Sequence, residues 1–520
     1  MKKDLGTGLL VGFLLAGPLV AVLFLFHIAE GTPFIPFDFF DGLARVLPGR
    51  LVTAGIDTMV RVLMFLGLSL RSSSKTAEQI QAIAIFMGIC AVASAIFFAT
   101  RKQGRPMATW TAGVVLGIAV AIPMMVLQHL VGSTHEHSLL GAVWTTFALA
   151  VWGLCTHAAW RHLATGPLLV EAGSRRRFLI ELGGATASIT VIGAAVAASL
   201  RTANNVVQAG SEVELPDRPG AVLPAPGTRR EYTPVAEHYR IDINLMPMKI
   251  DGDKWRLPIT GLVDRPLSLS LNDFRNFGEP LHQFVTLSCI SNPVGGDLIG
   301  TTRWSGVSVR RILRSTGVRA AARFLKITSD DGFYETVPLD LINSDERIMF
   351  TYLWDGKPLT MEHGFPLRIY IPDRYGMKQP KWITKAELVE NDEPGYWVAR
   401  GWDKVARMKA TSVIDTVAVE SPVHANGQTF VPIGGIAHAG ARGISRVEVR
   451  VDDGAWISAT LRTPLSDLTW VLWRYDLPFQ PGNHRFTVRC FDGAGHAQIE
   501  TPQEPHPSGA SGLFNIRKRL

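Results

Sequence analysis

Apolar residues are distributed very unevenly along the chain. Five stretches near the N-terminus run for about 20 residues with almost no charge, and each is long enough to cross a bilayer as an α-helix. These stretches are residues 5–26, 80–99, 108–131, 139–160 and 178–200. The pattern therefore predicts an N-terminal α-helical transmembrane region, residues 1–200, with five spans.

A sixth apolar stretch, from Leu51 to Leu70, carries Asp57 and Arg61 near its middle. Because buried charge is costly inside a bilayer, this stretch is better interpreted as an interfacial or re-entrant helix than as a span.

The basic residues of the N-terminal region provide a check on this topology. With five spans, the N-terminal lysines and the basic loops at residues 101–105 and 161–177 all lie on the cytoplasmic side, as the positive-inside bias prefers. Everything after residue 200 then lies outside the cytoplasm. A six-span alternative remains open, since the loop of residues 30–78 also holds several cations.

The rest of the chain has the mixed polarity of a globular protein and divides into three parts. Residues 201–235 contain five prolines and little apolar periodicity, which is typical of an extended extracytoplasmic linker. Residues 236–414 mix short β-like runs with short amphipathic helices and predict an α+β domain. Residues 415–520 show period-two strands between turns such as Asp453-Gly454, a pattern that predicts an immunoglobulin-like β-sandwich.

Charge and cysteine content narrow the class of protein. The formal net charge of +7 comes largely with cations beside the apolar helices, and no basic stripe interleaved with aromatics follows, so a nucleic-acid partner is not expected. Of the four cysteines, Cys90 and Cys155 lie in predicted spans, leaving Cys289 and Cys490 in the globular part. Such a set is a poor disulfide framework, so the soluble thiols need another explanation.

A basic run precedes the last predicted span. The sequence Ser174-Arg175-Arg176-Arg177-Phe178-Leu179 is similar to a twin-arginine export signal, which serves proteins folded around a cofactor before export. The alternative is that the three arginines only fix the cytoplasmic end of a helix.

Cys289 is the first candidate for chemistry. It lies where an apolar strand, residues 284–288, runs into a loop rich in Asn, Pro and Gly. A lone cysteine is more often a small core residue than a ligand or nucleophile, so this position alone does not decide its role.

A second cluster lies about 75 to 90 residues further along the chain. His363 and Arg368 enter a strand, and Lys378 and Lys381 follow within a glycine-containing segment. Together they would form a cradle for a phosphate and a polar heterocycle. By composition alone, a hairpin with solvated cations is the more ordinary interpretation.

The order of these motifs resembles the oxidoreductase molybdopterin-binding domain of the sulfite oxidase superfamily, shared by sulfite oxidases, plant-type nitrate reductases and the periplasmic methionine sulfoxide reductase catalytic subunit. The resemblance runs from about residue 232 to the end of the chain. It rests on the cysteine loop, residues 303–307 and 329–333, the His-Gly-Phe-Pro-x-Arg run and the Gly-x-Lys-x-x-Lys-Trp run.

The resemblance implies a molybdenum cofactor with Cys289 as the thiolate ligand of the metal, an arrangement that a soft metal site favours. It also implies cofactor contacts from Asn244, from Asn292 in the cysteine loop, and from the cationic cluster, which comprises His363, Arg368, Lys378 and Lys381. By the same resemblance, residues 415–520 are similar to a dimerisation domain, which implies a homodimer.

Two departures from the family bear on the substrate. Where sulfite oxidases carry arginines of an anion pocket, this chain has Asp242 and Val294. Charge complementarity then favours a neutral or cationic substrate, such as a sulfoxide or N-oxide, over sulfite.

These features predict a membrane-anchored, extracytoplasmic oxygen-atom transferase that exchanges electrons with a separate redox carrier. A bound haem is not expected, because His27 and His129 have no spacing that places them on one face and His157 lies near the opposite membrane face. The alternative is a non-enzymatic, membrane-tethered binding module that retains the fold as a scaffold.

Overall fold

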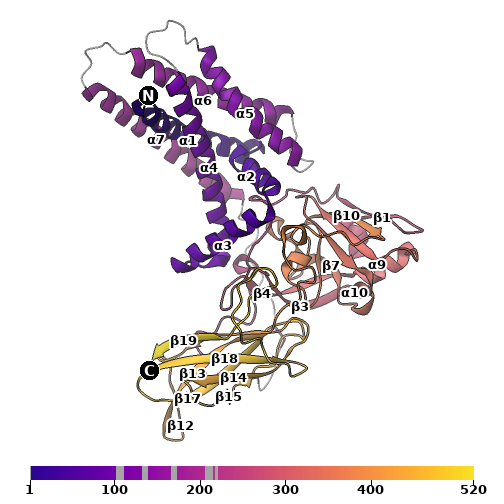
Figure 1. The fold of residues 1–520 in the computed structure, drawn as a ribbon. Coiled ribbons are helices and arrows are strands. Elements are labelled where there is room, and N and C mark those ends of the chain that lie inside the picture. Colours follow the sequence, from indigo (N-terminus) through magenta and orange to yellow (C-terminus); the bar gives the residue numbers. More distant parts are fainter. Residues whose placement is uncertain (1, 101–109, 132–138, 166–171, 205–214, 217–220) are drawn as a thin grey trace. The chain divides into compact units, whose positions relative to one another are not determined.

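The computed structural model describes residues 2–100, 110–131, 139–165, 172–204, 215–216 and 221–520. The chain forms two compact units, both visible in Figure 1. The first comprises Met1–Leu47, Lys75–Ala209 and Ile243–Met246, and the second comprises Pro48–Ser74, Gly210–Asp242 and Pro247–Leu520.

The first unit is a bundle of long helices. They are α1 (Lys2–Glu30), α2 (Ile35–Val46), the greater part of α4 (Leu70–Thr100), α5 (Thr111–Val131), α6 (Leu139–Thr165) and α7 (Ala172–Asn204). Helix α5 packs along α6 through glycines, because a Cβ atom on Gly153 would lie 2.1 Å from the carbonyl oxygen of Gly113. Small residues of this kind allow the close backbone approach found between membrane helices.

Three helices in the described part of the chain are long and apolar enough to cross a membrane. They are Asp4–Glu30, Leu70–Thr100 and Leu139–Leu163, and they indicate a multi-pass membrane protein. The described apolar part of α5, Thr111–Leu127, is shorter. Five spans therefore stay a prediction, and the loop of residues 101–105 and the His129 side chain lie outside what the structure describes.

The middle of the chain forms a β-rich domain of two sheets with short helices. One sheet has the order β2 (Leu267–Ser270), β1 (Arg256–Gly261), β10 (Ile383–Val389), β5 (Phe324–Ser329) and β6 (Tyr334–Pro338). The other has the order β3 (Leu281–Ser288), β4 (Ile299–Ser308), β7 (Met349–Trp354) and β8 (Lys357–Pro358), with β9 (Arg368–Tyr370) on β7. The two sheets share one core, in which Ile259, Ile327 and Phe350 are fully buried.

Short helices complete this second unit. They are α3 (Gly49–Phe65), α8 (Leu271–Arg275), α9 (Val309–Thr316), α10 (Leu339–Ser344) and the 3-10 turns η1 (Val235–Glu237), η2 (Met361–His363), η3 (Gly376–Lys378) and η4 (Val398–Arg400). Helix α3 lies in the stretch interpreted from sequence as an interfacial or re-entrant helix, and it packs on η4.

The C-terminal part is a β-sandwich, as the period-two pattern predicts. One sheet contains β11 (Thr411–Val417), β13 (Gln428–His438), β17 (Val471–Pro478) and β16 (Thr460–Leu461), with β12 (Val423–Ala425) on β13. The other contains β15 (Ile457–Ser458), β14 (Ile444–Val451), β18 (Asn483–Asp492) and β19 (Phe514–Arg519). Alternate residues, including Ile433, Val447, Trp473 and Phe486, meet in the apolar core between the sheets.

Part of the segment interpreted as a linker is fixed to the second unit. The Arg229 guanidinium pairs with Asp415 at 2.6 Å, and the Glu231 carboxylate accepts from Arg462 at 3.0 Å. The Trp470 indole donates to the Glu231 carbonyl at 2.9 Å. Hydropathy does not reveal these anchors because they are polar contacts to residues more than 180 positions away.

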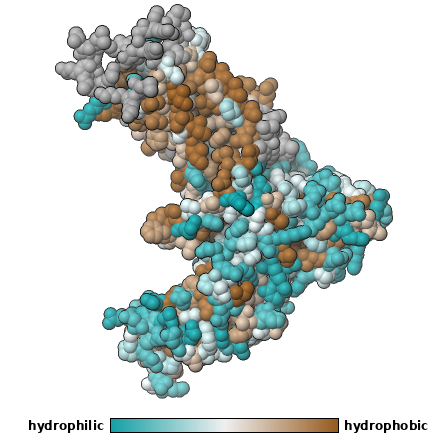
Figure 2. Space-filling model, viewed as in Figure 1, coloured by the Kyte–Doolittle hydropathy of each residue, from teal (hydrophilic) through white to brown (hydrophobic). Residues whose placement is uncertain are grey.

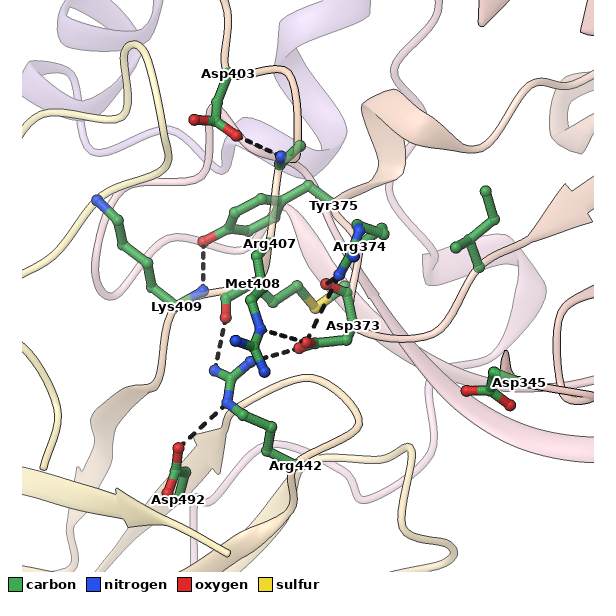
Figure 3. Close-up of polar contacts among 12 residues, drawn as sticks. Asp345, Asp373, Arg374, Tyr375, Asp403, Arg407, Met408, Lys409, Arg442 and Asp492 are labelled. Carbon is green, nitrogen blue, oxygen red and sulfur yellow. Dashed lines mark hydrogen bonds and ion pairs between the residues drawn. The ribbon is translucent and has the colours of Figure 1, made fainter. Parts of the chain in front are cut away.

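An ion network joins the sandwich to the domain before it (Figure 3). The Asp373 carboxylate lies 2.6 Å from the guanidinium groups of both Arg407 and Arg442, and Arg442 also contacts Asp492 at 3.3 Å. Because Asp373 lies between Arg368 and Lys378 in the sequence and Arg442 belongs to the sandwich, the two domains share this carboxylate.

The sandwich core predicts a clear difference between two phenylalanines. Phe486 is fully buried, whereas Phe479 is 45% exposed. Phe486→Ala is expected to lower the free energy of unfolding by about 3–5 kcal/mol, because it leaves a cavity in a packed core. Thermal and urea unfolding of the purified protein in detergent would measure this loss, and Phe479→Ala is the control with less than about 1 kcal/mol expected. Equal losses for the two variants would contradict the packing described for this core.

Candidate functional site

Cys289 directly follows β3 and is the first residue of a loop whose two ends are hydrogen-bonded to each other. Its backbone N–H donates to the Leu298 carbonyl at 2.9 Å, so residue 289 pairs with the far end of the loop. Inside the loop, the Asn292 side-chain oxygen accepts from the Leu298 N–H at 3.0 Å. The loop is therefore held in one shape by its own backbone and by Asn292.

The Cys289 thiol is almost completely enclosed. The residue is 8% exposed, and its Sγ lies 3.0 Å from the Ser291 hydroxyl oxygen. Burial raises the pKa of the Cys289 thiol, and the contact with Ser291 only partly opposes this effect. Such a thiol keeps its proton at neutral pH unless a cation replaces the proton, as a coordinated metal does.

The edge of β3 is covered by the C-terminal sandwich. The Thr286 N–H donates to the Leu468 carbonyl at 2.9 Å, and the Trp470 N–H donates to the Thr286 hydroxyl at 2.8 Å. The Ser466 hydroxyl donates to the Phe284 carbonyl at 2.6 Å. The strand that leads to Cys289 is thus paired with β4 on one edge and with residues 466–470 on the other.

The cysteine loop is also tied to the start of α4. The Asp297 carboxylate accepts from the Ser69 hydroxyl at 2.5 Å and from the Arg71 N–H at 3.0 Å. Both donors follow α3 in the chain and belong to the second unit. No sequence pattern predicts this contact, because it links positions more than 220 residues apart.

Of the sequence-predicted residues, His363 and Arg368 lie against two tryptophans, and Lys381 donates to the carbonyl of Glu362, the neighbour of His363, at 3.3 Å. The His363 ring lies 4.7 Å from the Trp354 ring, and the Arg368 guanidinium lies 4.3 Å from the centre of the Trp304 ring. Arg368 also donates to the His363 carbonyl at 3.1 Å. His363 ends η2 and Arg368 begins β9, so the tight turn at Gly364, with φ of +106°, brings these two side chains together.

Buried cations dominate the electrostatics of this cluster. Arg368 is 3% exposed, burial lowers its pKa to about 10, and its Nε has no hydrogen-bond partner within the described structure. Burial likewise lowers the pKa of Lys381 to about 8, with Asp242 opposing the shift. Two desolvated cations with one nearby carboxylate form a site that favours an anion.

Asp242 serves this cluster as an internal counter-ion. Its carboxylate lies 2.8 Å from Arg240 and 3.1 Å from Lys381, and its side chain is 1% exposed. Asp242 is therefore held by two cations within the second unit.

His238 and Tyr239 also belong to the cluster, although the sequence analysis did not single them out. The His238 ring lies 5.6 Å from His363 and 5.0 Å from Trp354, and its Nε2 has no hydrogen-bond partner among the described residues. Burial lowers the pKa of His238 to about 3 and that of His363 well below its usual value, so both rings are neutral. Burial raises the pKa of Tyr239, and the nearby Cys289 raises it further. The run of polar and aromatic residues at 238–240 was the available sequence signal.

Three predicted cofactor residues have other contacts. Asn244 lies in the first unit, where its side-chain oxygen accepts from Arg45 at 2.5 Å. Lys378 forms a buried ion pair with Glu335 at 2.5 Å, and burial raises the pKa of that carboxyl group. Asn292 uses its oxygen to close the cysteine loop. The structure thus groups His363, Arg368 and Lys381 in one cluster and gives the other three separate partners.

The donor set fits a pterin cofactor with a phosphate. It combines a soft sulfur ligand on a fixed loop, two buried cations and two neutral imidazoles. The unpartnered Nε of Arg368 and Nε2 of His238 are buried donor or acceptor atoms that a polar ligand would satisfy.

Comparison with known proteins agrees with this chemistry. The family model described as oxidoreductase molybdopterin binding domain matches residues 244–397. The chain is 31% identical over 158 residues to the uncharacterized oxidoreductase YuiH of Bacillus subtilis, covering 30% of this chain and 76% of that protein.

More distant relatives match a larger part of the chain. The chain is 28% identical over 321 residues to mitochondrial sulfite oxidase of Homo sapiens, which covers 53% of this chain and 57% of the relative. This chain therefore spans little more than half the length of that relative. A crystal structure of the sulfane dehydrogenase SoxCD from Paracoccus pantotrophus superposes with a TM-score of 0.50 at 18% identity, covering 61% of this chain and 92% of that one.

The similarity to SoxCD concerns the fold alone. The assignment to a family rests on sequence similarity instead. The YuiH match covers most of that protein, and the family model spans the domain that holds the cation cluster. The chain belongs to the sulfite oxidase family and is a molybdopterin-dependent oxidoreductase.

Proposed function

We propose that this protein is a membrane-anchored enzyme that transfers an oxygen atom to or from its substrate in a two-electron reaction, with its catalytic unit outside the cytoplasm. The observation that carries the proposal is the enclosed Cys289 thiol at the end of a strand that is paired on both edges, together with a buried cation cluster whose carboxylates do not neutralise it. Tyr239 links the two, because its pKa responds to both Cys289 and Arg368. A structural domain gains nothing from burying such cations without an anionic ligand.

Each residue of the cluster has a definite task in this proposal. Cys289 supplies the thiolate to the metal, and the loop closed by Asn292 holds that sulfur in position. Arg368 and Lys381 bind the phosphate of the pterin, and neutral His363 hydrogen-bonds to its polar atoms. When bound, the cofactor supplies a metal that accepts or releases an oxygen atom with two electrons.

The substrate is better described as a sulfoxide or N-oxide than as sulfite. Val294, at a position where sulfite oxidases carry an arginine, contacts an apolar cluster that includes Ile299 and Trp470. Asp242, at the other such position, is already neutralised by Arg240 and Lys381. Neither residue offers a cation to a dianionic substrate, so the argument rests on the missing arginines and not on repulsion by Asp242.

A cavity beside the cysteine loop offers room for a small substrate group. Its lining includes Ser288, Asn292, Tyr375 and Lys409, together with His438 from the sandwich. Burial lowers the pKa of His438 to about 3, so its ring is neutral at physiological pH.

Electrons are exchanged with a separate redox carrier, since no haem is expected in the helical unit. His27 contacts the Thr32 carbonyl and the ring of Phe34, and His157 lies against Phe97 and Trp160. The extracytoplasmic orientation rests on the five-span topology and the twin-arginine-like run, and a homodimer through the sandwich on the family resemblance.

A binding module that retains the fold without catalysis is the alternative. A module of this kind needs neither an enclosed thiol nor unpaired nitrogens on Arg368 and His238. The metal content of the purified protein therefore distinguishes the two proposals.

Replacement of the cysteine tests the proposed function directly. Protein purified from membranes of a cofactor-competent host is expected to hold about one molybdenum per chain and to show thiolate-to-metal absorption. Cys289→Ser is expected to lose that absorption band while keeping the fold. Elemental analysis and visible spectroscopy measure both quantities, and Cys490→Ser is the control, since Cys490 is a buried thiol of the sandwich. Folded wild-type protein without metal or pterin would exclude the enzyme.

Lys381 is expected to make cofactor retention depend on pH. Because the pKa of Lys381 is lowered to about 8, its ammonium group loses its proton as the pH rises through that value. Affinity for the pterin phosphate then falls by up to about tenfold per pH unit above the pKa. Pterin retained after dialysis at about pH 7 and about pH 9, measured by fluorescence of its oxidised form, gives this dependence.

Two variants control the pH experiment. Lys381→Arg is expected to remove the pH dependence, because a guanidinium group stays charged over the whole range. Lys378→Arg is expected to leave it unchanged, since Lys378 is paired with Glu335. A wild-type protein that retains pterin equally well at both pH values would rule out a phosphate contact by Lys381.

A further inference from the structure

Helix α3 belongs to the second unit and packs on η4, yet several of its apolar side chains are exposed. Thr53 and Leu63 are buried, and Gly49 fits closely against Arg400 of η4. On other faces of the helix, Leu51 is 59% exposed and Val62 is 50% exposed. A helix on the surface of a soluble protein normally turns polar residues outward, so α3 departs from that pattern.

The exposed apolar surface continues beyond the end of α3. Phe65 is 90% exposed, and Met64, Leu66 and Leu68 are 50%, 59% and 47% exposed. Gly67, with φ of +67°, turns the chain between them. We call residues 62–68 the apolar tip; Figure 2 shows the end of α3 as a brown protrusion of the second unit.

Elsewhere in the second unit, among the residues that the structure describes, exposed apolar residues do not gather in this way along the sequence. Val423, Ile457, Phe479 and Ile499 are exposed singly, as is normal for a protein surface. A contiguous apolar cluster instead marks a surface that is covered by a partner or by lipid.

We propose that α3 and the apolar tip insert into the surface of the lipid bilayer and attach the catalytic unit to it. Chain continuity identifies lipid as the partner. The tip is followed directly by α4, Leu70–Thr100, which is a candidate membrane span, and the span Asp4–Glu30 ends shortly before α2 and α3. A segment connected on both sides to membrane helices is held at the lipid surface.

The charges of α3 fit an interfacial position. Arg50 and Arg61 are exposed, which suits contact with lipid headgroups. The Arg61 Nε donates to the Asp57 carbonyl at 3.3 Å, so its stem lies along the helix and not away from it. Long basic side chains of this kind cover apolar surface while their charged ends stay near water.

The Asp297 carboxylate connects the segment that follows the apolar tip to the cysteine loop. Ser69 and Arg71 follow the apolar tip and hold Asp297, which lies in the loop that Cys289 opens. A membrane-bound tip therefore restrains the loop at the same time as it anchors the unit. The proposal depends on the membrane helices and not on the identity of the cofactor.

The test uses the full chain reconstituted in phosphatidylcholine vesicles that contain a fraction of anionic phosphatidylglycerol. Phe65→Cys would be labelled with an environment-sensitive fluorophore in a Cys155→Ser background, because Cys155 is exposed while the other three native cysteines are buried. Lipids carrying a spin label on the acyl chain are expected to quench the fluorophore at least twofold, and aqueous iodide is expected to have little effect.

Two further positions make the result decisive. Leu66→Cys is expected to behave like Phe65→Cys, whereas Phe479→Cys, an exposed phenylalanine of the sandwich, is expected to be quenched by iodide and not by lipid. Quenching of the label at position 65 by iodide alone would overturn the proposal. Protection from both quenchers that grows with the protein-to-lipid ratio would also overturn it, because a second copy of the chain would then cover the tip.

Discussion

The site depends on how the free edge of β3 is closed. An edge strand leaves backbone N–H and carbonyl groups unpaired, and β3 carries the candidate metal ligand at its end. Residues 466–470 of the sandwich supply the missing partners, through Thr286, Ser466 and Trp470. The sandwich is therefore part of the wall that positions the cysteine, whatever its role in dimerisation. The ion network around Asp373 joins the same two domains at a second place.

Buried cations of the second unit differ in how completely they are neutralised. Lys378 is paired with Glu335, and the partly buried Arg229 is paired with Asp415. Around Arg368 and Lys381 this pairing is incomplete, since Asp242 must serve both Lys381 and Arg240. Incomplete neutralisation is costly for stability and is kept where a ligand supplies the remaining charge. The contrast supports the proposed role of Lys381 in binding the cofactor and a structural role for Lys378, two roles that the motif alone does not distinguish.

Sequence patterns predicted the sandwich and the position of Cys289 well, because both are local. Strands β14, β17 and β18 follow from period-two alternation, and the cysteine follows an apolar run. The partners of Lys378 and Asn244 could not be predicted, since Glu335 and Arg45 are set by tertiary packing and have no spacing signal. The anchored segment around Arg229 and Glu231 was missed for the same reason, because prolines there suggest an extended chain whether or not it is bound. His238 and Tyr239 lie just beyond those prolines and were passed over with them.

The contact between Thr286 and Trp470 has a consequence for the order of assembly. The two residues are 184 positions apart, so synthesis must proceed past the middle of the sandwich before the cysteine strand has both neighbours. Until then β3 has only β4 beside it, and the cysteine loop lacks the contacts that residues 466–470 supply to its strand. The final geometry around Cys289 is thus set late in the synthesis of the chain.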